Sequence, residues 1–247
     1  MSQVRGESAP VPPKAKHTLL AALTLAAACT SRPAPPRPPA SDTAPAATAT
    51  DARPTIVFLG TSLTAGLGLD PDDAYPALIQ QKLDSAHLDF RVVNAGVSGE
   101  TSAGALRRID WVLRGPVRVL VIETGANDGL RGQDPDSTRA NIEAIIAKAR
   151  TRRPVPVVAL VQMRALPNYG ADYRRRFDGL YPDVARRDSV TLLPFLLDRV
   201  AGIDSLNQAD GIHPNRIGER IVAENVWRAL EPILRRMTDA SGRRGGS

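Results

Sequence analysis

The stretch TIVFLGTSLTAGLG (55–68) sets the start of the fold: an apolar, β-branched run ends at a glycine and leads into a polar, glycine-bearing segment. Such a run predicts a strand buried on both faces. Similar runs follow along the chain, so we predict strands at residues 55–59, 91–94, 117–123, 155–162 and 190–193. Between them, apolar residues recur at the helical period. One such helix follows Ser137 as its N-cap, and the last covers residues 215–236.

Strands that alternate with helices predict an α/β fold, and the expected architecture is a three-layer α/β/α sandwich. We expect a five-stranded parallel sheet in the flavodoxin-like order 2-1-3-4-5. In this order the first and third strands are neighbours, and the chain leaves them toward opposite faces, which opens a crevice where ligands bind. The loop after the first strand carries Ser62 and the loop after the third carries Asn127. The topology therefore predicts that these residues lie close together.

Ser62 needs a base to become a nucleophile, because a serine hydroxyl is unreactive until its proton is taken. Among the three histidines, His213 is the candidate, since it follows Asp210 in the loop ADGIHPN (209–215). An aspartate that binds one ring nitrogen leaves the other free to accept a proton. Ser62, Asp210 and His213 are thus predicted to form a catalytic triad. The order Ser, Asp, His is also that of the α/β-hydrolases, but GTSLT lacks the second glycine of their G-x-S-x-G elbow, so Ser62 is not the serine of that fold.

A triad also needs donors aimed at the developing oxyanion. The side chain of Asn127 and the backbone N–H groups of Ser62 and Gly96 are the candidates, because glycine lets the backbone approach a substrate closely. Asp128, next to Asn127, is interpreted as a residue that organises its own loop.

Four stretches resemble blocks I, II, III and V of the SGNH, or GDSL, hydrolases: GTSLTAGLG (60–68), NAGVSGET (94–101), TGANDGLRG (124–132) and ADGIHPN (209–215). LPNYG (166–170) and LLPF (192–195) are similar to the branch that contains thioesterase I, lysophospholipase and arylesterase. This resemblance implies a hydrolase domain over residues 55–236 that cleaves acyl esters and thioesters through an acyl-enzyme, with no metal and no cofactor. It assigns catalysis to Ser62, Asp210 and His213, and the oxyanion hole to Ser62, Gly96 and Asn127.

Two positions depart from the family pattern. Thr61 stands where the G-D-S-L motif has aspartate, and Ala126 stands where this branch commonly has glycine. A carboxylate can organise the turn by accepting backbone N–H bonds, which threonine does only partly. Two alternatives to the acyl esterase stay open: a carbohydrate acetyl-esterase of the same fold with a shorter, more polar pocket, and a non-catalytic surface binding module.

The N-terminal segment is typical of an exported protein. Residues 1–28 have a basic start followed by an uncharged apolar stretch, which predicts a cleavable signal peptide. LAAAC (25–29) resembles a bacterial lipobox, which implies a signal peptide of the lipoprotein type with Cys29 as the lipidation site; an ordinary signal cleaved near Ala28 is the alternative. Residues 29–54 are rich in Pro and Ala and predict a disordered tether. The expected location is the periplasmic face of a membrane, or otherwise a soluble periplasmic or secreted state.

The formal net charge of +6 is carried mostly by the segments outside the hydrolase domain. Aromatic residues are few and no nucleic-acid motif is present, so we expect a small-molecule ester or thioester substrate and no nucleic-acid partner. Contact with a membrane is expected through the lipid anchor only. Residues 237–247 predict a disordered tail.

Overall fold

Residues 53–244 are described in the computed structural model, where five parallel strands form one sheet in the order β2-β1-β3-β4-β5. The predicted order and fold class are confirmed. The strands are β1 (Thr55–Gly60), β2 (Arg91–Gly96), β3 (Val117–Ile122), β4 (Val157–Gln162) and β5 (Thr191–Phe195). The predicted signal peptide, Cys29 and nearly all of the tether lie outside the described residues.

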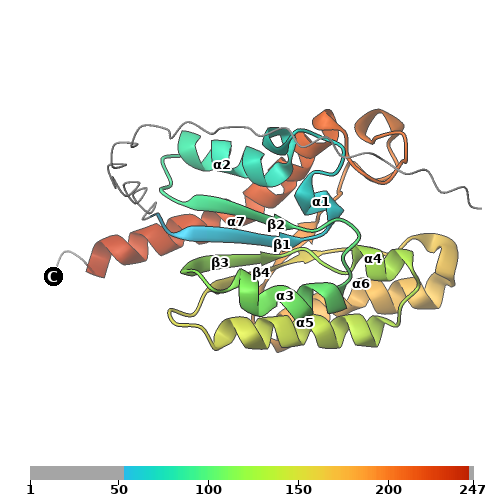
Figure 1. The fold of residues 1–247 in the computed structure, drawn as a ribbon, viewed down its shortest axis with the longest axis horizontal. Coiled ribbons are helices and arrows are strands. Elements are labelled where there is room, and N and C mark those ends of the chain that lie inside the picture. The colour runs from blue at the N-terminus through green and yellow to red at the C-terminus, as the bar shows by residue number, and fades with distance from the viewer. Residues whose placement is uncertain (1–52, 245–247) are drawn as a thin grey trace, which may run out of the picture. The chain divides into compact units, whose positions relative to one another are not determined.

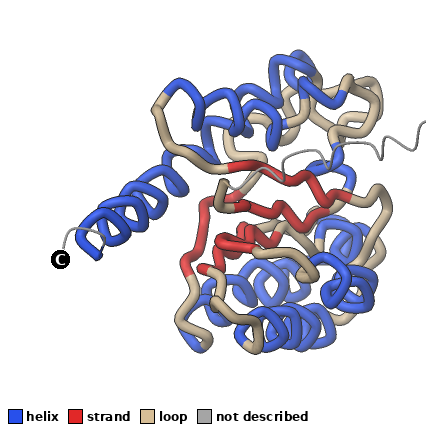
Figure 2. Tube along the Cα trace, turned by 60° about the vertical axis from the view of Figure 1, so that its left-hand side comes forward, coloured by secondary structure: helices blue, strands red, loops and turns tan. Residues whose placement is uncertain are grey.

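Helices cover both faces of the sheet (Figure 1). Helices α2 (Tyr75–Ser85) and α7 (Arg216–Arg244) pack together on one face. Helices α3 (Ser102–Val112), α5 (Pro135–Arg150) and α6 (Gly170–Arg187) pack side by side on the other. The short helices α1 (Ser62–Ala65) and α4 (Ala126–Leu130) and the 3₁₀ turns η1 (Pro71–Asp73), η2 (Pro167–Tyr169) and η3 (Asp204–Leu206) lie in the connections. Figure 2 shows the strands enclosed between the two helical layers.

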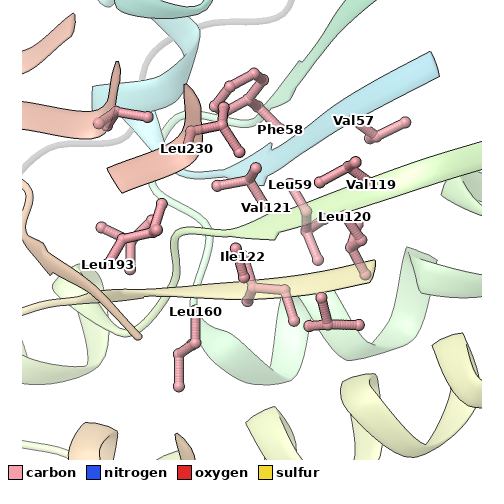
Figure 3. Packing of buried hydrophobic residues seen from close by; sticks show 14 of the residues in the cluster. Val57, Phe58, Leu59, Val119, Leu120, Val121, Ile122, Leu160, Leu193 and Leu230 are labelled. Atoms are coloured by element: carbon pink, nitrogen blue, oxygen red, sulfur yellow. The ribbon is translucent and has the colours of Figure 1, made fainter. Parts of the chain in front are cut away.

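The core lies where the central strands meet the helices. Residues 56–59 of β1 and 119–122 of β3 are almost completely buried, as expected for strands covered on both faces. Figure 3 shows their side chains packed with those of β4, β5 and α7, among them Leu160, Leu193 and Leu230. The edge strands β2 and β5 are only partly buried. This packing holds the carboxyl ends of β1 and β3 side by side, with Leu59 opposite Ile122.

Two helix boundaries differ from the sequence-based expectation. Helix α5 begins after Asp134, whose side chain accepts from the Asp136 N–H at 3.2 Å, so the predicted N-cap Ser137 lies inside the helix. Pro135 occupies the first helical position, which its fixed φ favours. Helix α7 continues past the expected end at residue 236 to Arg244, so the prediction of a disordered tail over residues 237–247 is wrong for residues 237–244. Met237 packs against the core. Within the described part of the chain, no helix combines the length and apolar character needed to cross a membrane.

Candidate active site

Ser62 is the first residue of α1, separated from the end of β1 by Thr61 alone, and it is 8% exposed. Thr61 is the N-cap, and its side chain accepts from the Leu63 N–H at 3.4 Å. The helix ends after one turn at Gly66, whose φ of 71° lies in the left-handed region that favours glycine. This tight strand–turn–helix junction fixes the direction of the Ser62 side chain at the carboxyl end of the sheet.

Ser62, His213 and Asp210 lie in line. The Nε2 atom of His213 is 2.8 Å from the Ser62 hydroxyl, and its Nδ1 atom is 2.6 Å from Oδ2 of Asp210. The structure therefore brings together two residues 151 positions apart, with the carboxylate on the far side of the imidazole. With a proton on Nδ1 bonded to Asp210, Nε2 is the nitrogen that can accept the serine proton.

Asp210 is held ionised by its own loop. Its Oδ1 atom accepts from the backbone N–H groups of His213 at 3.0 Å and Ile212 at 2.9 Å. These two backbone hydrogen bonds, followed by the hydrogen bond from the His213 side chain, lower the pKa of Asp210 from 3.8 to about 2. Because the same carboxylate binds the backbone and the ring of His213, it fixes both the loop and the imidazole orientation.

Asn127 lies in α4, beyond the carboxyl end of β3. Its Nδ2 atom donates to the Glu100 carbonyl at 3.0 Å, which connects it to the loop after β2. That loop is in turn bound to the serine turn, because the Val97 N–H donates to the Gly60 carbonyl at 2.9 Å and Asn94 Nδ2 donates to the Thr64 carbonyl at 2.8 Å. An amide nitrogen has two hydrogens, so Asn127 can still offer one to a substrate.

Gly96 has a different role from the one expected. Its N–H donates to Oδ1 of Asn94 at 2.9 Å and is already engaged. The glycine is explained by packing, since a Cβ atom at this position would lie 2.3 Å from the Ala65 backbone nitrogen. Gly99 follows in the same loop with a φ of +76°, and no described residue accepts a hydrogen bond from its N–H. Because both positions are glycine, the sequence does not tell which of the two has a free backbone N–H.

Asp128 organises its loop, as predicted. It is fully buried and accepts from the Ser102 N–H at 2.8 Å and the Ser102 hydroxyl at 2.6 Å. The Thr138 hydroxyl donates to the same carboxylate at 3.3 Å. These contacts join α3 and α5 to the turn that carries Asn127. Asp128 is therefore not one of the residues hydrogen-bonded in sequence from Ser62 through His213 to Asp210.

The loop after β4 presents apolar and aromatic side chains. Leu166 is 48% exposed and Tyr169 is 43% exposed. The Tyr169 hydroxyl donates to the Leu130 carbonyl at 3.1 Å, and its ring contacts that of Tyr173 with the centroids 5.2 Å apart. Tyr169 is therefore an exposed residue whose position is fixed by its contacts with Leu130 and Tyr173. A cavity of about 440 Å³ lies nearby, lined by residues 97–101 and by Gly104, Arg107, Arg108 and Arg131.

Glu123 and Gln208 are site residues that the sequence reasoning missed. Glu123 follows β3 and lies fully buried beneath Thr61, to which it is hydrogen-bonded. Gln208 binds the loop of Ser62 to the loop of His213. A glutamate at the end of an apolar strand, followed by TGAND, was a usable signal, because a buried carboxylate requires partners. No comparable signal marked Gln208.

Comparisons with known proteins show the family to which this chain is related. The GDSL-like lipase/acylhydrolase family matches residues 58–221. Esterase TesA of Pseudomonas aeruginosa is 41% identical over 181 residues, which cover 73% of this chain and 89% of that protein. Thioesterase 1/protease 1/lysophospholipase L1 of Escherichia coli K12 is 36% identical over 73% of this chain and 85% of its own length. A crystal structure of TesA superposes with a TM-score of 0.69 at 40% identity, over 72% of this chain and 98% of that one.

Proposed function

Because the chain belongs to the GDSL-like lipase/acylhydrolase family, we propose that it is a serine hydrolase that cleaves acyl esters and thioesters through an acyl-enzyme. The observation that carries this proposal is the line of hydrogen bonds from Ser62 through His213 to Asp210, at 2.8 and 2.6 Å. A nucleophile, a base and a group that orients the base are the three parts that this chemistry needs.

In the proposed reaction, Ser62 Oγ attacks the acyl carbon while His213 Nε2 accepts the hydroxyl proton. The tetrahedral intermediate then collapses, the bond to the leaving oxygen or sulfur breaks, and His213 returns the proton to that atom. Water attacks the acyl-enzyme with His213 again as base, which releases the carboxylic acid and restores the Ser62 hydroxyl. Asp210 stays ionised throughout and stabilises the imidazolium that forms at each step.

Three donors are assigned to the oxyanion. Ser62 is the first residue of α1, a position whose N–H has no acceptor within the helix. Asn127 offers the Nδ2 hydrogen that Glu100 does not use. The third donor is the Gly99 N–H in place of Gly96, since the Gly96 N–H is engaged by Asn94. Each such donor contributes about 3 kcal/mol to transition-state stabilisation.

An apolar acyl group is favoured over a sugar-bound acetyl group by the surface next to the catalytic residues. Leu67 follows α1, Val97 follows Gly96 and Ile212 precedes His213, and their side chains are 45%, 43% and 42% exposed. Exposed apolar side chains at these places can contact a hydrocarbon chain. The relatives named esterase and thioesterase/lysophospholipase support the same substrate class.

An acyl-chain-length profile tests the substrate class. The full chain is assayed with p-nitrophenyl acetate, butanoate and octanoate, with an octanoyl thioester and with an acetylated sugar. We expect faster hydrolysis of the longer acyl chains and complete dependence on Ser62, with Ser62→Ala as the control. A preference for the acetylated sugar supports the carbohydrate acetyl-esterase instead. Absence of turnover on all of these substrates by the folded protein supports the non-catalytic binding module.

The N-terminal segment carries a separate proposal. Residues 1–28 direct export and Cys29 becomes the lipid anchor, on the strength of the resemblance of LAAAC to a lipobox. These residues lie outside the described part of the chain, so the support is the sequence alone. Cys29→Ser should move the protein from the membrane fraction to the soluble fraction of a bacterial host. An unchanged distribution would reject the lipid anchor and favour an ordinary cleaved signal.

A further inference from the structure

Glu123 is buried beneath the turn that carries Ser62, which comprises residues 61–64. It follows β3 directly, its N–H donates to the Leu59 carbonyl at 2.8 Å, and its side chain is fully buried. Neither the proposed acid–base steps nor the proposed oxyanion hole uses this carboxylate. A buried carboxylate is costly unless donors surround it, so the identity of its donors indicates what it does.

The donors come from both sides of Ser62. The Thr61 N–H donates to Oε2 of Glu123 at 2.8 Å, and the Thr61 hydroxyl lies 3.1 and 3.0 Å from the two carboxylate oxygens. The Thr64 hydroxyl donates to Oε2 at 2.8 Å. One carboxylate thus binds the residue before the nucleophile and the residue two positions after it, and it restrains the backbone from which Ser62 projects.

The same contacts extend into the layer formed by α2 and α7. Since the single hydroxyl hydrogen of Thr64 is given to Glu123, the Thr64 oxygen accepts from the Tyr75 hydroxyl at 2.8 Å. Tyr75 is fully buried, and its N–H donates to Oε2 of Glu219 at 2.8 Å. The turn is therefore connected through Glu123 to β3 and through Tyr75 to both of these helices.

Gly60 shows how tightly this arrangement is built. A Cβ atom at Gly60 would lie 1.9 Å from the Thr64 hydroxyl oxygen and 2.7 Å from Oε2 of Glu123. Only glycine leaves room for the carboxylate and the hydroxyl to meet. Burial raises the pKa of Glu123 from 4.5 to about 7, while the hydrogen bonds from Thr61 and Thr64 act in the opposite direction.

Thr61 is matched to this carboxylate. The G-D-S-L motif has aspartate here, and a second carboxylate beside Glu123 would be disfavoured by the repulsion of like charges. Threonine instead donates from its hydroxyl and still accepts from the Leu63 N–H as the N-cap. The departure at Thr61 therefore adds a donor to the contacts of Glu123.

We propose that Glu123 is a positioning residue for Ser62: by accepting from Thr61 and Thr64 it holds the turn so that the serine hydroxyl meets His213. This inference rests on the proposed function, because it presupposes that Ser62 is the nucleophile. Glu123 acts on Ser62 only through the turn, so its loss should lower kcat. A reacting group misplaced by about 1 Å lowers the rate roughly 10²-fold.

The test compares Glu123→Leu with Glu123→Gln. Leucine has a similar volume but accepts no hydrogen bond, so kcat for p-nitrophenyl octanoate should fall about 10- to 100-fold with little change in KM. The rate of Ser62 labelling by a fluorophosphonate should fall by the same factor. Glutamine keeps one acceptor oxygen for the Thr61 N–H and the Thr64 hydroxyl, so both rates in Glu123→Gln should stay within about threefold of the wild type.

Thr124→Val is the matched control. Thr124 is adjacent to Glu123 and equally buried, but its hydroxyl has no hydrogen-bond partner among the described residues. This variant removes a buried hydroxyl without touching the turn, so we expect wild-type kcat and wild-type labelling. A loss equal to that of Glu123→Leu would overturn the proposal, because it would show that any polar change in this segment lowers the rate.

Thr61→Val and Thr64→Val test the same contacts from the other side and decide the matter if Glu123→Leu does not fold. Each should lower kcat while KM stays near the wild-type value, and Thr61→Val combined with Glu123→Gln should lose less than the product of the two single losses. Wild-type kcat in both valine variants, or in folded Glu123→Leu, would overturn the positioning role. Full ester hydrolysis by Ser62→Ala would instead overturn the proposed function, so the two failures are distinguishable.

Discussion

Gln208 Nε2 donates to the Leu67 carbonyl at 2.7 Å, and this bond ties the loop that carries Asp210 and His213 to the loop that follows Ser62. The same amide nitrogen donates to the Pro214 carbonyl at 3.0 Å, and the Gln208 N–H donates to the His213 carbonyl at 2.8 Å. A Cβ atom at Gly68 would lie 2.4 Å from the Gln208 side chain, which explains the glycine there. The distance between nucleophile and base is thus set by contacts outside the triad.

Gln208→Glu should lower kcat about tenfold, because it replaces a donor shared by two carbonyl groups with a group that repels them. Steady-state kinetics on an octanoyl ester measures the effect, and Gln81→Glu on the exposed side of α2 is the control. Wild-type kcat in Gln208→Glu would show that this bond does not position His213.

Asn127→Ala should lower kcat by about 10²- to 10³-fold with a smaller change in KM, because it deletes an oxyanion donor that acts mainly in the transition state. The matched control is Asn141→Ala, which removes another half-buried amide that donates to the Ser102 hydroxyl. Equal losses in the two variants would assign the effect of Asn127 to structure, since Asn127 also binds the Glu100 carbonyl.

Glu219 should make the free energy of unfolding depend on pH. Burial raises its pKa from 4.5 to about 8. The folded chain therefore holds a proton that the unfolded chain loses near pH 4.5, so this contribution is fully present below that pH and is lost as the pH rises through about 8. Glu123 adds a smaller effect of the same sign, with its pKa at about 7.

Glu219→Gln should remove most of this dependence, so the urea midpoint should fall less between pH 5 and about pH 8.5 than it does in the wild type. Glu224→Gln, on the same helix, is the control. The Lys82 and Arg228 side chains lower the pKa of Glu224. The ionised Glu224 therefore contributes to the free energy of unfolding at neutral pH, and this contribution is lost only in acid, below the ordinary pKa of a glutamate. An identical decrease in the wild type and Glu219→Gln would contradict the protonation of Glu219 in the folded state.

The fold and the hydrogen-bonded arrangement of Ser62, His213 and Asp210 could be predicted from sequence for different reasons. Continuous apolar runs in the sequence predict the strands of the sheet, and the preference for right-handed crossovers leaves few possible strand orders. Ser62 and His213 were paired because a serine nucleophile needs a base and the chain offers few histidines. The need of a serine nucleophile for a base therefore predicts the contact between Ser62 and His213, although no local sequence pattern connects residues 151 positions apart.

Glu123, Gln208 and Gly96 show where that reasoning ends. The burial of Glu123 depends on Thr61 and Thr64 meeting it across the sheet, which no periodicity encodes. Glycine can be required for a close backbone approach or for a positive φ, and Gly96 and Gly99 each satisfy one of these reasons. Helix α7 extends beyond the predicted end at residue 236, and the contacts of Met237 exist only in the folded core.

Modification by a fluorophosphonate probe is the decisive test of Ser62 as the nucleophile. The full chain is incubated with the probe and the modified residue is located by peptide mass spectrometry. Modification of Ser62 alone is expected, with labelling slowed strongly in His213→Ala, because His213 Nε2 lies 2.8 Å from the hydroxyl and takes its proton. If the probe abolishes ester hydrolysis by the folded protein while Ser62 remains unmodified, Ser62 is not the nucleophile.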